Sequence, residues 1–210
     1  IIGSPKASMT LWEMPTMHLN VGMGGGMMPS VGGDMAMGAN LVFEYNPRLF
    51  GMSEVHTFLH ASYGIAPREN LDALFASGFP VISTIFNDDE GSDSAAFARS
   101  SIGVLKRIYM GRLFIDLGVA ASASYYLLDK VETLSGDYDL AIISVGGEGL
   151  VGLGFQLSPR FLFRAQGGYH FGIAMPTVTD PNGEALELDS NAVLEAEAGI
   201  FAGINLLYTI

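Results

Sequence analysis

The stretch Leu194–Ile210, which reads LEAEAGIFAGINLLYTI, decides the fold. Apolar residues alternate along it with polar or small ones, so that one face is a continuous row of Leu, Ala, Ile and Tyr side chains. The other face begins with Glu195 and Glu197, and its apolar exceptions are Phe201 and Leu207. Alternation with period two is the pattern of a β-strand whose two faces meet different surroundings. At about 17 residues, the strand is longer than most strands of soluble proteins.

The same alternation recurs in seven further segments of the chain. Each places Leu, Val, Ile, Met, Ala or aromatic residues on one face and mostly Gly, Ser, Asn, His or charged residues on the other. Lys106 is an exception on an apolar face, but near a strand end the stem of a lysine can lie along an apolar surface while its ammonium group reaches water. The sequence therefore predicts eight strands. The seven further segments are 17–27, 34–45, 55–65, 97–109, 112–125, 143–156 and 160–173.

Composition excludes several classes of protein. Of the 210 residues, 49% are hydrophobic and only 15% are charged, which is unlike a disordered chain and unlike an ordinary soluble domain. The longest uncharged run, 14–33, contains six glycines and two prolines and does not suit a transmembrane helix. The chain has no cysteine, which excludes disulfides, thiol nucleophiles and cysteine-based metal sites.

The net charge of −12 lies in three connections between the predicted strands. Segments 66–96, 129–139 and 174–191 hold fourteen acidic and two basic residues, and the rest of the chain is neutral. The connections around 46–48, 110–111 and 158–159 are short turns. Short turns at one end and long loops at the other are typical of outer-membrane barrels, as are aromatic residues near both ends of the apolar faces. Nucleic acid is excluded as a partner, because binding phosphate needs a basic patch.

With these features, the sequence resembles the small eight-stranded outer-membrane β-barrel proteins of the OmpA transmembrane domain and OmpX type. Leu157–Phe163, running into Gly167–Tyr169, resembles their turn-and-strand pattern. Leu206-x-Tyr208-x-Ile210 resembles their C-terminal assembly signal, although these barrels usually end on an aromatic residue. The resemblance implies an all-β fold in the bacterial outer membrane: an eight-stranded antiparallel transmembrane up-and-down β-barrel with short periplasmic turns and longer acidic extracellular loops.

We expect an N-terminal periplasmic segment over residues 1–13 and a single barrel domain over residues 14–210. The alternative architecture is a soluble barrel of the lipocalin kind, apolar inside and polar outside. The outer face of such a barrel would be rich in Lys, Glu and Asp. Here the polar face carries many Gly, Ser and Asn residues with sparse charges of both signs, which favours a crowded polar lumen.

Strand parity places five arginines and six acids on the lumen face. The interior of an eight-stranded barrel is just wide enough for side chains, and an unpaired desolvated charge costs several kcal/mol. We therefore expect a paired structural network that blocks passage, with Glu148 and Arg164 as one pair. The expected network comprises Arg99, Arg107, Arg112, Arg160, Arg164, Asp34, Glu44, Asp116, Glu148, Glu195 and Glu197.

The histidines His18, His56, His60 and His170 all fall on the polar face. His56 and His60 would lie about 13 Å apart along a strand, too far to share one metal ion. No Ser–His–carboxylate set can be placed at the lipid-facing rim, and the acidic run 87–93 lacks the spacing of an EF-hand loop. We interpret the histidines as part of the polar lumen and predict no metal, no cofactor and no catalytic residues.

Segment 66–96 is long for a connection in a compact domain, and such loops usually carry a function or are disordered. Residues 68–76 have the apolar spacing of a short amphipathic helix. The apolar run that follows would be costly in open water, so we expect it to plug the barrel mouth or to dock a partner. Its side chains are Phe79, Val81, Ile82, Ile85 and Phe86.

Two classes of function remain. The first is a non-enzymatic structural or interaction protein at the cell surface, either alone or as a subunit of a larger outer-membrane assembly. The second is a narrow channel or transporter for small solutes, and an outer-membrane lipid-modifying enzyme is a third alternative. The expected partners are outer-membrane lipids and lipopolysaccharide, together with other outer-membrane or periplasmic proteins.

Overall fold

The fold comes from a computed structural model of the chain, which describes residues 19–47, 54–68, 71, 94–128, 131–133, 136–187 and 195–210. These ranges contain nine strands and one 3₁₀ turn, η1 (Val31–Gly33). The strands are β1 (Leu19–Pro29), β2 (Met35–Tyr45), β3 (Val55–Pro67), β4 (Ser94–Met110), β5 (Leu113–Leu127), β6 (Val131–Thr133), β7 (Gly136–Gln156), β8 (Phe161–Thr179) and β9 (Glu195–Thr209).

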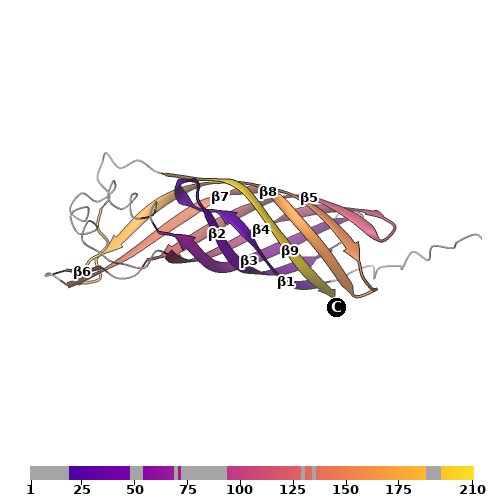
Figure 1. Ribbon diagram of the computed structural model, residues 1–210, viewed down its shortest axis with the longest axis horizontal. Helices are drawn as coiled ribbons and strands as arrows, with labels where there is room; N and C mark the ends of the chain where they lie inside the picture. The colour runs from indigo at the N-terminus through magenta and orange to yellow at the C-terminus, as the bar shows by residue number, and fades with distance from the viewer. Residues whose placement is uncertain are drawn as a thin grey trace, which may run out of the picture.

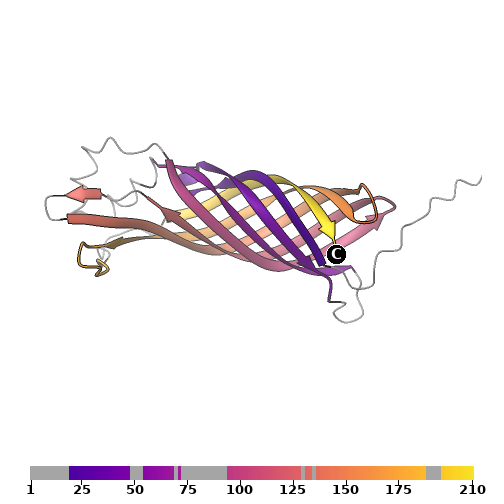
Figure 2. The same cartoon turned by 90° about the horizontal axis from the view of Figure 1, so that it is seen from below.

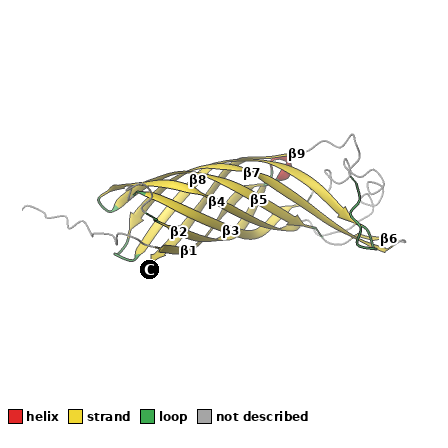
Figure 3. Cartoon of the chain, turned by 180° about the vertical axis from the view of Figure 1, so that it is seen from behind, coloured by secondary structure: helices red, strands yellow, loops and turns green. Residues whose placement is uncertain are grey.

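Eight of the strands close into an antiparallel barrel (Figure 1). Neighbours along the chain pair with each other, β5 pairs directly with β7, and β9 returns to pair with β1. The strands cross the barrel at a marked tilt (Figure 2), and they surround the interior on all sides (Figure 3). The predicted all-β fold of eight up-and-down strands is confirmed.

The ninth strand, β6, forms a small hairpin with the start of β7 beyond the barrel wall. The expectation that β6 and the start of β7 form a loop was wrong. The sequence 180–183, Asp-Pro-Asn-Gly, predicts a hairpin beyond the membrane in the connection after β8, and the chain does turn back there, with Leu186 N donating to the carbonyl of Val178 at 2.8 Å. β7 begins at Gly136, inside the predicted loop 129–139, and β8 continues to Thr179, inside the predicted loop 174–191. Residues at the start of β7 alternate like those of the barrel, but Asp137 and Asp139 indicated a loop. Residues 174–179 at the end of β8 contain no acid and also alternate between buried and exposed side chains.

The apolar faces of the strands point outward. Met23, Ile102 and Ile200 expose 68%, 66% and 70% of their surface, and large apolar side chains are exposed on every barrel strand. The polar faces point inward, where many charged, amide and hydroxyl side chains are buried. This is the reverse of a lipocalin-type barrel and matches a barrel whose outer face meets lipid. No helix in the described residues is long and apolar enough to cross a membrane.

Candidate functional site

The interior of the barrel contains most of the buried polar and charged side chains of the described residues. Near the short turns, four buried apolar side chains pack together from β2, β5, β8 and β9, with Tyr109 against them. The ring of one of them, Phe114, lies beneath the guanidinium of Arg107, 4.4 Å from its centroid. The four apolar residues are Val42, Phe114, Leu162 and Leu207.

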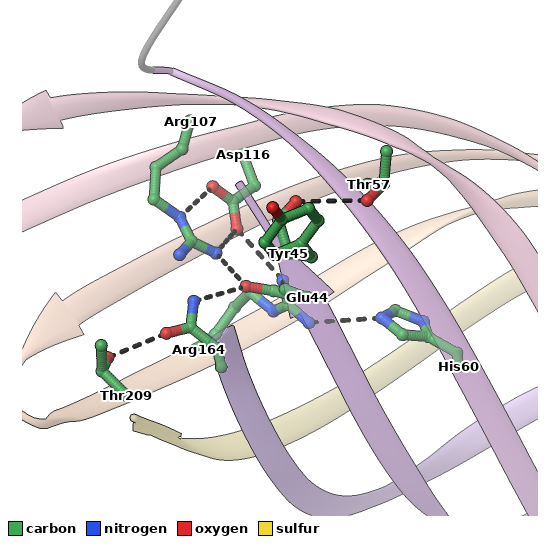
Figure 4. A network of polar contacts seen from close by, with 9 residues as sticks. Glu44, Tyr45, Thr57, His60, Arg107, Asp116, Arg164 and Thr209 are labelled. Carbon is green, nitrogen blue, oxygen red and sulfur yellow. Dashed lines mark hydrogen bonds and ion pairs between the residues drawn. The ribbon is translucent and has the colours of Figure 1, made fainter. Parts of the chain in front are cut away.

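Beside them lie four charged side chains that we call the short-turn cluster: Glu44, Arg107, Asp116 and Arg164 (Figure 4). Arg107 donates to both oxygens of Asp116, Nε to Oδ1 at 2.8 Å and Nη2 to Oδ2 at 2.7 Å, and also to Glu44 at 3.0 Å. Arg164 donates to Glu44 and, at 3.2 Å, to Asp116. All four side chains are fully buried, and two positive charges face two negative charges.

Neutral side chains extend this cluster around the barrel wall. The amide of Asn20 donates to Glu44 at 3.0 Å, and the hydroxyl of Thr209 donates to Asn20 at 2.8 Å, which joins the first and last strands. On the other side, the Arg164 guanidinium lies 3.4 Å from Nε2 of His60 (Figure 4). The connected set takes side chains from every barrel strand except β7.

Strand β7 places glycines, which have no side chain, beside the short-turn cluster. Gly152 is paired with Asp116 on β5, and a Cβ placed there would lie 3.2 Å from the side chains of Arg164 and Asp116. Gly154 is more confined, because a Cβ there would lie 1.9 Å from the ring of Phe114. The glycines of β7 therefore make room for the arginine cluster and the aromatic ring beneath it.

A second polar group lies nearer the loops, and we call Arg99, Glu148, His170 and Glu197 the loop-side cluster. Arg99 is bound to Glu197 and donates to Ser124 Oγ at 2.8 Å and to the carbonyl of Pro29 at 3.0 Å. The Tyr126 hydroxyl donates to the same carboxylate at 2.6 Å. Glu197 thus accepts from a guanidinium and a phenol at once.

His170 lies between the two acids of the loop-side cluster. Its Nδ1 is 3.6 Å from Glu148 and 3.3 Å from the hydroxyl of Ser122, and its Nε2 is 3.6 Å from Glu197. Because the carboxylates contact opposite sides of the ring, they do not converge on one point, and the described residues contain no group of three or more His, Asp or Glu side chains arranged to hold a metal ion. Ser122 and His170 are both buried in the lumen.

A small cavity of about 30 Å³ separates the two clusters. Three buried polar atoms of its lining residues have no hydrogen-bond partner among the described residues: Asn40 Oδ1, Gln166 Oε1 and Arg99 Nη1. A polar cavity of this size holds one or two water molecules. Further polar residues around it are His60, Ser62, Ser101 and Glu148.

Above the loop-side cluster, the lumen is closed by a second apolar core. Most of its side chains come from η1 and from the loop ends of the strands, while Phe58, Leu105 and Leu150 extend it toward the middle of the barrel, and the rings of Phe97 and Tyr126 stack with centroids 6.0 Å apart. Apart from the small cavity, the described interior is packed with apolar side chains and ion pairs. Residues of this upper core include Val31, Phe97, Tyr126, Leu140, Ile142 and Val178.

The structure brings seven of the eleven predicted network residues into the interior: Arg99, Arg107, Arg164, Glu44, Asp116, Glu148 and Glu197. The others differ from expectation. Arg112 and Arg160 are exposed in the short turns, where Arg160 donates to the Tyr208 hydroxyl at 3.2 Å. Asp34 and Glu195 are half-buried at the loop-end starts of their strands.

The expected pairing of Glu148 with Arg164 was wrong. Glu148 accepts from Ser101 at 3.0 Å and contacts His170, whereas Arg164 binds the acids of the short-turn cluster. The expected plug or partner segment with Phe79, Val81, Ile82, Ile85 and Phe86 lies outside the described residues, as do His18 and the segment 1–13.

Sequence reasoning did not single out several members of the interior. Asn20, Thr209, Ser124 and Tyr126 complete the two clusters, and the apolar exceptions Phe201 and Leu207 pack inside the lumen. A signal for most of them was present, since strand parity alone places Asn20, Ser124 and Thr209 on the polar face.

Solved structures share this fold. A major outer membrane protein from Thermus thermophilus matches with a TM-score of 0.61 at 12% identity, over 93% of this chain and 100% of that one. Ail, the attachment invasion locus protein of Yersinia pestis, solved with the heparin analogue sucrose octasulfate, matches with a TM-score of 0.48 at 11% identity, over 92% and 97% of the chains. Neisserial surface protein A matches with a TM-score of 0.44 at 12% identity, over 91% and 97%.

No protein-family model and no curated protein matches the sequence. At these identities the likeness concerns the fold, which is that of a bacterial outer-membrane β-barrel.

Proposed function

We propose that this outer-membrane β-barrel is a non-enzymatic structural and interaction protein whose closed interior passes no solute. The observation that supports the proposal is the filling of the lumen: two balanced arginine–acid pairs and a second arginine cluster lie between apolar layers. Separating the members of a buried ion pair leaves uncompensated charges in a dry interior, so such pairs resist opening.

The length of β7 and β8 supports a role in interaction with other molecules. About 9–11 tilted residues are enough for a strand to cross a bilayer, yet β7 has 21 residues and β8 has 19. Their excess length lies at the loop end, next to β6 (Figure 1). A sheet that extends past the membrane at the loop end presents acidic connections to other outer-membrane proteins and can join a larger assembly. The apolar outer wall of the barrel contacts outer-membrane lipids and lipopolysaccharide, and the short turns face periplasmic proteins.

A catalytic role for Ser122 and His170 is not part of the proposal. Lipid and peptide substrates would need access to a hydroxyl that lies within the filled lumen, and the described rim of the barrel carries no comparable pair. A channel remains the alternative outcome of the test below.

Recordings in planar lipid bilayers test the closed interior. The purified protein should give no stepwise conductance in molar potassium chloride, while a general porin inserted under the same conditions shows that the assay detects openings. Reproducible, ion-selective steps from the wild-type barrel would contradict the proposal and establish a channel.

A further inference from the structure

A groove of about 550 Å³ crosses the outer face of the barrel over β4, β5 and β7. Its outer walls are apolar side chains that point away from the lumen, and Val104, Val119 and Val151 expose 45%, 61% and 52% of their surface. Its floor includes Leu105 and Leu150, which are buried and face the lumen. The hollow exists in part because Gly149 has no side chain between these valines: a Cβ at this position would have no atom within 4 Å. Leu117 completes the apolar wall.

The lining suits an elongated apolar ligand. The groove is shallow and open toward the outside, and its lining is apolar except for the side chain of Lys106. On the outer face of a membrane barrel, this groove meets acyl chains, and an acyl chain that lies along it covers the valines and fills the gap over Gly149.

One end of the groove carries a pair of opposite charges. Lys106 lines the groove four residues before the end of β4, and Nζ lies 3.8 Å from Oε2 of Glu54, which directly precedes β3. Both side chains are more than half exposed, so each retains hydrogen-bonding capacity for a ligand. Both lie toward the short-turn end of the barrel.

This arrangement is complementary to one kind of lipid head group. A phosphate would contact the ammonium of Lys106, and a primary ammonium close to that phosphate would contact the carboxylate of Glu54. A phosphoethanolamine head group carries these two charges next to each other. Phosphocholine carries them too, but its quaternary ammonium has no N–H to donate to the Glu54 carboxylate. A head group with phosphate alone would satisfy Lys106 and leave Glu54 facing a like charge.

We propose that the groove over Gly149 is a binding site for one phosphatidylethanolamine molecule, which seats an acyl chain between Val104, Val119 and Val151 and its head group on Lys106 and Glu54. With the short turns on the periplasmic side, as the sequence predicts, this lipid belongs to the inner leaflet. The site does not depend on whether the lumen conducts, because it lies on the opposite face of the wall.

Native mass spectrometry tests the site. The full chain in mild detergent is incubated with equal amounts of phosphatidylethanolamine, phosphatidylglycerol and phosphatidylcholine. The protein is then freed of detergent in the mass spectrometer, and the lipid that stays bound is identified by its mass. Wild-type protein should keep one phosphatidylethanolamine in preference to the other two. Gly149→Leu fills the groove and should lower this retention at least tenfold.

Gly147→Leu is the matched control, because Gly147 also points outward on β7 and does not line the groove. It should retain the lipid as the wild type does, and β-sheet circular dichroism of both variants reports that they fold. Lys106→Gln and Glu54→Gln should each abolish the preference for phosphatidylethanolamine. Equal retention of the three lipids by wild type, preference for phosphatidylglycerol, or unchanged binding by folded Gly149→Leu would each overturn the proposal.

Discussion

The two polar clusters of the lumen share residue types but differ in charge balance. The short-turn cluster contains two arginines and two acids, and each of the four side chains contacts both side chains of opposite charge. Glu44 also accepts a hydrogen bond from the neutral Asn20. The loop-side cluster has one arginine and two acids, with His170 between the carboxylates and a cavity beside it. In the first the charges balance, although Arg107 Nη1 and Arg164 Nε have no hydrogen-bond partner among the described residues, whereas the second has an excess of acid and is supplemented by hydroxyls, a histidine and room for water.

This difference indicates where the barrel tolerates change. Removing one charge from the balanced cluster leaves a partner charge in a dry interior, which is among the most destabilising changes known in proteins. Removing one acid from the loop-side cluster leaves one arginine and one carboxylate. The two halves of the same lumen should therefore respond differently to the same chemical change.

The largest effect is expected from Glu44→Gln. The change keeps the shape of the side chain but leaves Arg107 and Arg164 with only Asp116 as an acid, so the free energy of unfolding should fall by about 3–5 kcal/mol. Urea unfolding in detergent micelles, followed by circular dichroism, measures it.

A second substitution checks that charge balance is the cause. In Glu44→Gln/Arg164→Met the cluster again has one positive and one negative charge, so the double variant should lose less stability than the sum of the two single variants. Simple additivity would show that the four charges act independently.

An intermediate loss in the free energy of unfolding is expected from a side chain added to β7 at Gly154. Gly154→Ala puts a methyl group into the ring of Phe114, which is held under Arg107, and should cost about 1–3 kcal/mol in the same unfolding assay. Gly149→Ala on the same strand adds a methyl group in open space and should change stability by less than about 0.5 kcal/mol. Equal losses would show that the strand resists any side chain, whatever the packing.

The smallest effect is expected from Glu148→Gln in the loop-side cluster. Its amide oxygen still accepts from Ser101, and Arg99 keeps Glu197, so the loss should be about 1 kcal/mol or less. A loss as large as that of Glu44→Gln would remove the distinction between the clusters. The same urea titration provides the measurement.

Alternation with period two was enough to predict the eight strands, the outward apolar face and the inward placement of residues such as Arg99 and Glu44. Parity failed for Arg112 and Arg160, because each lies in a short turn where the strand alternation has ended. It also failed to mark the upper part of β7 as strand, since the acids there indicated a loop.

Partners across the lumen could not be predicted from the sequence. The pairing of Arg164 with Glu44 rather than Glu148 follows from the tilt of the strands and the stagger between them, which bring residues on non-adjacent strands to one level. Local sequence fixes which face a side chain takes, but the height at which it meets the opposite wall depends on the closed barrel as a whole.

The distribution of the short-turn cluster over the strands has a consequence for how the protein folds. Arg107 and Asp116 are nine residues apart and can neutralise each other within the β4–β5 hairpin, but Glu44 and Arg164 are 120 residues apart and meet only when the sheet has closed. An open sheet in the bilayer would leave Glu44 without Arg164, so that each of these charges would retain only one of its two ion-pair partners. Closure and insertion should therefore occur as one cooperative step, slow because it depends on contacts between distant parts of the chain.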